Sequence, residues 1–129
     1  MADKPRFKVR FDEAFHKADL DHATTAGAGV ARRARQRLER DGIAPEELRK
    51  CAAMGDDGTR LAGCVKTYLP PPEGRWGMVL CGGGLDVDGT PVLLVVAFGE
   101  RHPRRRSRPS VYQLADERLH GKRGAGPAT

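Results

Sequence analysis

The chain of 129 residues is 39% hydrophobic and 31% charged and carries a formal net charge of +6, a composition typical of one soluble globular domain. It has no signal-peptide core near its start and no stretch approaching the ~18 apolar residues of a membrane span, so we expect a cytoplasmic protein with no membrane partner. We place the domain over residues 1–121 and expect residues 122–129 to form a disordered tail.

The N-terminal part of the chain predicts one strand followed by helices. Residues 6–11 alternate between apolar and basic side chains, which is the period of a half-buried strand. Asp12 follows as a helix N-cap, and the spacing of apolar residues predicts helices over residues 13–20 and 26–40. Residues 44–54, with a proline in the first turn, predict a short third helix.

The second half predicts three strands and a final helix. Residues 60–69 and 75–81 alternate with period two, and the apolar run over residues 91–99 predicts a central strand that is covered on both faces. We expect residues 82–90 to form a long hairpin turn, and Ser110 to cap a short amphipathic helix. In the first of these strands, one face is predicted to carry Leu61, Val65, Thr67 and Leu69, and the other Cys64, Lys66 and Tyr68.

The order of these elements predicts the fold class. An N-terminal strand and two or three helices precede a three-stranded antiparallel meander and a short C-terminal helix. This arrangement belongs to the α+β class. We expect the helices to pack on one face of the sheet.

The net positive charge is concentrated in one segment. Residues 101–123 hold eight Arg and Lys against two acidic residues, whereas the rest of the chain holds fifteen of each sign. Such a patch attracts nucleic acid phosphates or an acidic partner, the alternative being a solvated basic tail. We interpret part of it as a loop that binds RNA phosphates without reading sequence, formed by Arg104, Arg105, Arg106 and Arg108.

Metal and disulfide sites have little support in the sequence. Three widely spaced cysteines, Cys51, Cys64 and Cys81, match neither a disulfide framework nor a paired zinc motif, and are predicted to be reduced thiols in or near the core. Four polar residues on the first helix could form a metal cluster, but a polar helix surface is the favoured interpretation: His16, Asp19, Asp21 and His22. We therefore predict no bound metal.

Four segments of the second half carry a family resemblance: GCVKTYL, GRWGMVL, TPVLLVVAFGER and SVYQLADERL. Together they resemble the RelE/ParE superfamily of bacterial toxins from toxin–antitoxin pairs, specifically its ribosome-dependent branch that cleaves messenger RNA. The most specific match is a strand that ends in Gly and Arg, followed by a Val-Tyr that opens a helix, here Gly99, Glu100, Arg101, Val111, Tyr112, Arg118 and Leu119. The resemblance implies a RelE-like fold and a metal-independent endoribonuclease without cofactor, whose partners are messenger RNA, the ribosome and a cognate antitoxin protein.

The resemblance also implies roles for individual residues. Metal-free RNA cleavage requires activation of a ribose 2′-hydroxyl, stabilisation of negative charge around phosphorus and protonation of the leaving 5′-oxygen. By resemblance, Arg101 stabilises the charge, Arg75 is a second clamp on the phosphate, and Lys66 acts as a base or proton relay. Tyr112 stacks on a base or assists proton transfer.

Two residues distinguish this chain from the family pattern. Tyr68 stands where related sequences often carry a second lysine, and we assign it to RNA binding. His102 directly follows Arg101, and an imidazole exchanges protons near neutral pH, so His102 is a candidate acid or base that replaces the missing lysine. An ordinary surface histidine is the alternative for that position.

Two other functions are open on the sequence alone. The sister branch of the superfamily inhibits DNA gyrase through protein contact, with the same fold and no nuclease chemistry. A non-catalytic nucleic-acid-binding protein is the second alternative, in which a change such as Tyr68 has removed the activity. Translation arrest without DNA damage would distinguish the nuclease from the gyrase inhibitor, and RNA cleavage would distinguish it from the binding protein.

Overall fold

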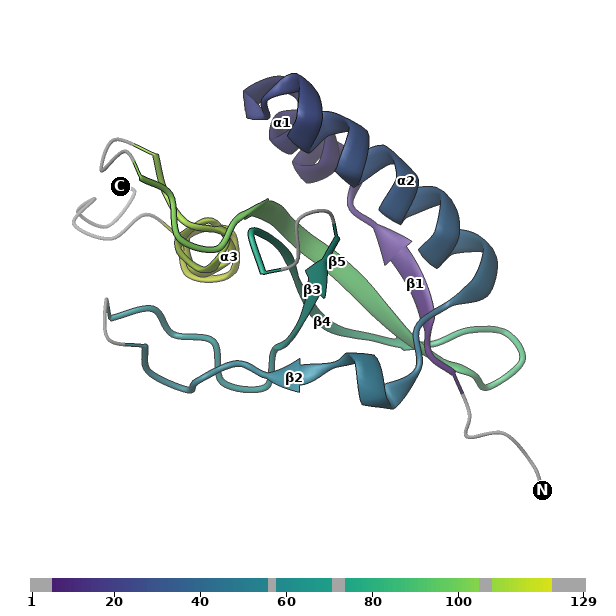
Figure 1. Ribbon diagram of the computed structural model, residues 1–129. Coiled ribbons are helices and arrows are strands. Elements are labelled where there is room, and N and C mark those ends of the chain that lie inside the picture. The colour runs from purple at the N-terminus through teal and green to yellow at the C-terminus, as the bar shows by residue number, and fades with distance from the viewer. Residues whose placement is uncertain (1–5, 56–57, 71–73, 105–107, 122–129) are drawn as a thin grey trace.

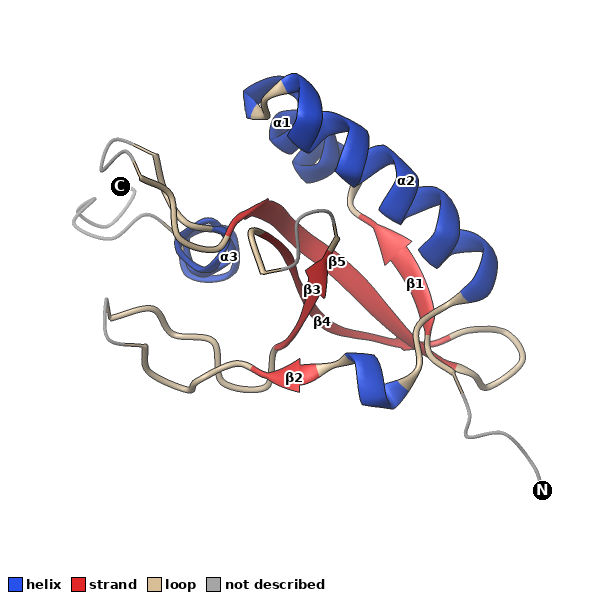
Figure 2. Ribbon diagram, in the orientation of Figure 1, coloured by secondary structure: helices blue, strands red, loops and turns tan. Residues whose placement is uncertain are grey.

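A mixed sheet organises the fold. The computed structural model describes residues 6–55, 58–70, 74–104 and 108–121, so the tail predicted over residues 122–129 lies outside the described residues. Within these ranges five strands form one sheet in the order β1-β5-β4-β3-β2, with three α-helices packed around it (Figures 1 and 2). The predicted α+β class is confirmed. The elements in chain order are β1 (Lys8–Phe11), α1 (Glu13–His22), α2 (Thr25–Asp41), the 3-10 turn η1 (Pro45–Glu47), β2 (Arg49–Lys50), β3 (Val65–Leu69), β4 (Trp76–Leu85), β5 (Pro91–Glu100) and α3 (Val111–His120).

The last strand, β5, lies in the interior of the sheet. It pairs in parallel with β1 and antiparallel with β4, which pairs antiparallel with β3. The strands β3, β4 and β5 therefore form the predicted meander. The residues of β5 are buried on both faces, as its continuous apolar sequence predicts, with Val95 and Phe98 in one cluster and Val96 and Ala97 in another.

The two faces of the sheet carry separate hydrophobic clusters. On one face, Met78 of β4 packs in a cluster with Leu38 of α2, and on the other, Val79 packs in a cluster with Val111 and Ala115 of α3. Because neighbouring residues of a strand point to opposite faces, α2 and α3 lie on opposite sides of the sheet (Figure 1). The prediction that the helices share one face is therefore wrong for α3.

Side-chain caps fix where two helices begin. The Asp12 carboxylate accepts a hydrogen bond from the Phe15 backbone N–H at 3.0 Å, which confirms the predicted cap of α1. The Ser110 hydroxyl accepts from the Gln113 N–H at 3.1 Å while the Gln113 side chain accepts from the Ser110 N–H at 2.9 Å, so α3 begins with a capping box.

Among the described residues, no helix combines the length and the apolar character that a bilayer span requires.

The third predicted helix, over residues 44–54, is wrong beyond its first turn. Only Pro45–Glu47 is helical, as a 3-10 turn, and the next residues form the short strand β2. Arg49 and Lys50 pair antiparallel with Lys66 and Val65 of β3. Pairing with a distant strand outweighs the weak helical preference of so short a segment.

The hairpin between β4 and β5 has a shorter turn than predicted. Gly82, Gly83 and Gly84 were expected in the turn, but they extend β4 as far as Leu85, and the turn itself is limited to residues 86–90. Pairing with β5 supplies the backbone hydrogen bonds that allow glycines to stay in a strand.

The strand β3 begins later than its sequence pattern suggests. Leu61 was expected on the same face as Thr67 and Leu69, but it lies before the strand and joins the cluster beneath α3. Thr67 and Leu69 are buried as predicted, and Lys66 and Tyr68 alternate with them on the opposite face. This alternation places Lys66 and Tyr68 on the side of the sheet that carries α3.

A buried ion pair closes the edge of β5 beyond the end of β1. The Asp19 carboxylate of α1 accepts from two nitrogens of Arg118 at 2.7 and 2.9 Å and from the backbone N–H of Phe98 at 2.8 Å. Arg118 also donates to the Val96 carbonyl at 2.9 Å, and its guanidinium lies 4.7 Å from the Phe15 ring centre. The pairing of β5 with β1 ends at Val95, so these contacts provide hydrogen-bond partners for the Val96 carbonyl and the Phe98 N–H. They also join α1 to α3.

The cysteines are free thiols, Cys64 buried and the other two partly buried, as predicted. Burial raises the pKa of the Cys51 thiol to about 11. Since the thiolate is the reactive form, we expect Cys51 at pH 8 to react with iodoacetamide at least about tenfold more slowly in the folded protein than in urea. Peptide mapping by mass spectrometry measures both rates, and equal rates would contradict the burial of this thiol.

Candidate functional site

The candidate site lies where β5 ends, on the face of the sheet that carries α3. Arg101 directly follows β5, and its backbone N–H donates to the Arg75 carbonyl at 2.9 Å, which fixes the start of its side chain. Tyr112 is the second residue of α3, and Lys66 lies on β3. The structure thus brings together side chains that are 46 positions apart in the sequence.

Three contacts hold the Arg101 guanidinium in one orientation. Its Nε donates to the Tyr112 hydroxyl at 2.9 Å, its Nη1 donates to the Gly74 carbonyl at 2.9 Å, and its Cζ lies 3.7 Å from the Tyr68 ring centre. A guanidinium this close to a ring centre is stacked on it. Because the Tyr112 oxygen accepts from Arg101, its own O–H hydrogen is directed elsewhere and can be donated to a ligand.

Lys66 lies between the two tyrosine rings. Its Nζ is 5.0 Å from the Tyr112 ring centre and 5.8 Å from the Tyr68 ring centre. The side chain is only partly buried, so its ammonium can contact a bound molecule. The predicted site residues Lys66, Tyr68, Arg101 and Tyr112 therefore form one group, which we call the tyrosine–cation cluster.

Arg49 is a fifth member of this cluster that the sequence did not reveal. Its Cζ lies 4.9 Å from the Tyr68 ring centre, and it pairs across the sheet with Lys66. The segment around Arg49 reads as helix, and a two-residue strand leaves no alternation to detect. Only the tertiary pairing of β2 with β3 places this arginine in the site.

The positive charges of the cluster are not neutralised within the described part of the chain. No carboxylate there lies within 4.0 Å of the charged nitrogens of Arg49, Lys66 or Arg101, whereas buried carboxylates pair with other arginines, as Asp116 does with Arg60. Like charges directly opposite each other on paired strands destabilise a sheet, and this is the arrangement of Arg49 and Lys66. A bound anion would remove that repulsion.

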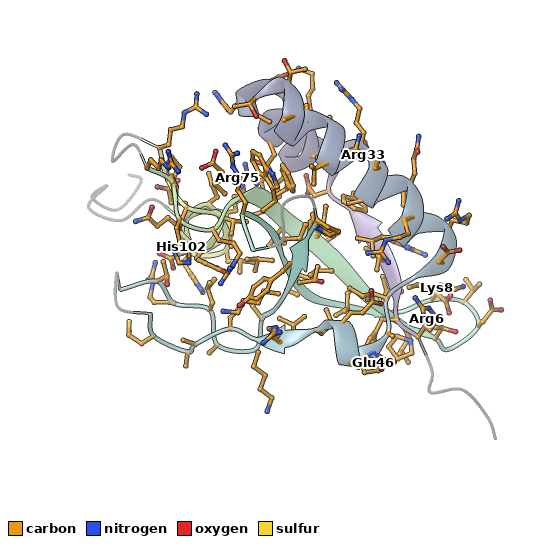
Figure 3. The ribbon with its side chains drawn as sticks, in the orientation of Figure 1. Arg6, Lys8, Arg33, Glu46, Arg75 and His102 are labelled. Atoms are coloured by element: carbon orange, nitrogen blue, oxygen red, sulfur yellow. The ribbon has the colours of Figure 1, made fainter. Side chains whose placement is uncertain are left out.

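Arg75, predicted as a second phosphate clamp, makes different contacts. Its guanidinium pairs with Glu100 at 3.6 Å and lies 4.9 Å from the ring centre of Trp76, a residue buried in the cluster beneath α2. In Figure 3, Arg75 is labelled between α1 and α3, and His102 is labelled beside α3. Within the described part of the chain, the contacts of the Arg75 side chain are thus with Glu100 and Trp76 and not with the tyrosine–cation cluster.

The remaining predicted residues follow Arg101 in the chain. His102 and Arg104 are exposed in the segment after β5, and the exposed Arg108 approaches the His22 carbonyl at 3.5 Å. Arg105 and Arg106 lie outside the described residues. The described members of the arginine loop thus leave their charges exposed to solvent.

The alternative metal cluster on the first helix is not supported. Asp19 is engaged by Arg118, and Asp21 pairs with Lys17 at 3.3 Å. Within the described ranges, no group of three or more His, Cys, Asp or Glu side chains could hold a metal ion.

Comparison with known proteins adds no relative. No family model, no curated protein and no solved structure matches this chain. The RelE/ParE resemblance thus stays a prediction, and the function must be inferred from the chemistry of the site.

The geometry of the tyrosine–cation cluster suits a ligand that carries both a phosphate and a planar ring. Arg101 and Lys66 offer charged donors to phosphate oxygens, and Tyr112 adds a neutral O–H donor. Aromatic and guanidinium planes are also the surfaces on which unpaired nucleic acid bases stack. A single-stranded nucleic acid presents both groups at every residue.

Proposed function

We propose that this protein is the toxin of a toxin–antitoxin pair and cleaves messenger RNA at the tyrosine–cation cluster, on the ribosome and without a metal ion. The observation that carries the proposal is the cluster of three cations, Arg49, Lys66 and Arg101, around tyrosine rings with no carboxylate partner among the described residues. Charges that are left without a partner in a folded protein indicate an anionic ligand. The sequence resemblance points to the same ligand and adds the reaction.

The proposed reaction assigns one task to each group. Lys66 first releases its proton to solvent, and its neutral amine then accepts the proton of the ribose 2′-hydroxyl while the 2′-oxygen attacks phosphorus to form a 2′,3′-cyclic phosphate. Arg101, fixed in place by Tyr112 and Gly74, stabilises the additional negative charge on the phosphate oxygens. As the bond from phosphorus to the 5′-oxygen breaks, Tyr112 donates its proton to that oxygen, and the Arg101 hydrogen bond stabilises the resulting phenolate.

An RNA end-mapping experiment tests this function. Ribosomes are first loaded with a defined messenger RNA and then incubated with the purified protein. EDTA is added to half of the samples to lower the concentration of free divalent ions. We expect cleavage products with 2′,3′-cyclic phosphate and 5′-hydroxyl ends. The cleavage rates with and without EDTA should differ by less than about twofold, as long as the concentration of free divalent ions stays above the value at which ribosomes dissociate. Loss of cleavage at that point would contradict the metal-free reaction.

Other outcomes would assign the chain to the alternatives. RNA binding without cleavage, with ribosomes present, would favour a non-catalytic binding protein. DNA damage without translation arrest after induced expression would favour the gyrase-inhibiting branch. Neither alternative needs the contact between Arg101 and Tyr112.

An antitoxin is the expected protein partner. We propose that an acidic or amphipathic segment of this antitoxin covers the basic face formed by Arg101 and its neighbours, which would block access of RNA. The charge of the segment from residue 101 to residue 123 suits such a partner.

A further inference from the structure

Gly77 lies in the interior of β4, where a glycine weakens a strand and therefore often marks a close approach of another group. Gly77 is buried and pairs with Gly99 on one side and with Tyr68 on the other. A Cβ atom built on Gly77 would lie 3.1 Å from Cγ and 3.4 Å from Cδ of Arg101. The space that a side chain would occupy here is filled by the stem of Arg101.

The path of this stem explains how Arg101 reaches the cluster. Arg101 follows β5, whereas the Tyr68 ring belongs to β3, so the arginine side chain crosses β4 to reach it. Gly77 is the β4 residue at the crossing, and the carbonyl of Gly74 accepts from the guanidinium beyond it. Gly74 has a φ of 82°, a backbone conformation that side chains rarely adopt.

We propose that Gly77 is a positioning residue for Arg101. Because Gly77 has no side chain, the stem of Arg101 can cross β4, and the guanidinium can stack on Tyr68 and bond to Tyr112. The catalytic consequence rests on the proposed function, but the placement of Arg101 does not. Displacements of about 1 Å in a group that contacts the reacting atoms can lower rates about 100-fold.

The same strand offers a matched control. Gly82 also lies in β4 without a positive φ, but it is exposed, and a Cβ built on it meets nothing within 4 Å. Valine has a high preference for strands, so Gly77→Val and Gly82→Val change strand preference in the same direction. They differ in whether the new side chain meets the stem of Arg101 and, at 3.4 Å, the Thr67 carbonyl oxygen.

The first readout is independent of activity. The Nε–Hε signal of Arg101 in a nitrogen–proton correlation spectrum is assigned by its absence in Arg101→Lys. Stacking on the Tyr68 ring and bonding to the Tyr112 oxygen give this signal a distinctive proton shift and slow exchange with water. We expect the signal to move and to exchange faster in Gly77→Val, and to stay in place in Gly82→Val. An unchanged signal in a folded Gly77→Val would overturn the proposal.

The second readout is RNA cleavage. We expect Gly77→Val to lower kcat at least about tenfold with less than about a threefold change in KM, and Gly82→Val to change neither beyond about twofold. If Gly77→Val does not fold, the smaller Gly77→Ala, which requires Arg101 to shift by a few tenths of an ångström, takes its place with Gly82→Ala as control. If the Arg101 signal moves in Gly77→Val but the parent protein does not cleave RNA, the positioning role is supported and the proposed function is contradicted. If the signal moves and Gly77→Val cleaves RNA as fast as the parent, the catalytic role of Arg101 is contradicted.

Discussion

Replacing Arg101 with alanine is expected to lower the rate of RNA cleavage by at least about 100-fold. Removal of one preorganised donor that stabilises transition-state charge typically costs a factor of about 100 to 1,000. Arg101 is such a donor, because contacts with Tyr68, Tyr112 and Gly74 fix its guanidinium before any ligand binds. The measurement is single-turnover cleavage of a ribosome-bound message, and the same variant should fail to arrest growth.

Two further variants separate charge, geometry and overall electrostatics. Arg33→Ala removes the same charge from the exposed side of α2, away from the site (Figure 3), and should retain cleavage within about twofold. Arg101→Lys keeps the charge but loses the planar fork, so we expect a rate between those of the parent and of Arg101→Ala. Full activity in a folded Arg101→Ala protein would rule out the assigned role.

The sequence alone suggests that Arg101 could be removed with no effect on the core, and the structure modifies this expectation. The stem of Arg101 packs over Gly77, and its guanidinium makes two hydrogen bonds in a partly buried position. We therefore expect Arg101→Ala to lower the free energy of unfolding by about 1–2 kcal/mol while the protein stays folded. Activity must accordingly be compared at a temperature well below the melting transition of the variant.

The parts of the fold that depend on local patterns could be predicted from the sequence. The alternation of Phe7, Val9 and Phe11, the caps at Asp12 and Ser110, and the apolar run of β5 each have a physical cause within a few neighbouring residues. The side of the sheet on which α3 packs depends instead on contacts between residues far apart in the sequence, such as those of Val111 and Ala115 in the cluster that contains Val79. No local pattern in the loop after β5 encodes that choice.

The candidate site shows the same limit. Arg101, Tyr112 and Lys66 were predicted from their resemblance to a family motif, and the structure brings them together. Arg49 could not be found because its strand exists only by pairing with β3. Arg75 was placed in the site by the same resemblance, but its guanidinium contacts Glu100 and Trp76, and these contacts are visible only in three dimensions.

The buried pair of Asp19 and Arg118 gives the largest expected effect on stability. The side chains are 4% and 13% exposed, respectively, so removal of one partner leaves a buried charge that water cannot solvate. Asp19 also serves the backbone N–H of Phe98, which would lose its partner together with Arg118. Breaking a buried ion pair in this way typically costs about 3–5 kcal/mol.

We therefore expect Asp19→Ala to lower the free energy of unfolding by about 3–5 kcal/mol, as measured by urea denaturation. The matched control is Asp21→Ala on the same helix, where an exposed carboxylate pairs with Lys17 at 3.3 Å and its loss should change stability by less than about 0.5 kcal/mol. In the double variant Asp19→Ala/Arg118→Met the unpaired arginine is removed, so the combined loss should be smaller than the sum of the two single losses. If Asp19→Ala and Asp21→Ala lower the free energy of unfolding equally, the buried pair of Asp19 and Arg118 contributes no more than a surface ion pair. That result would show that the buried pair does not hold α1 to α3.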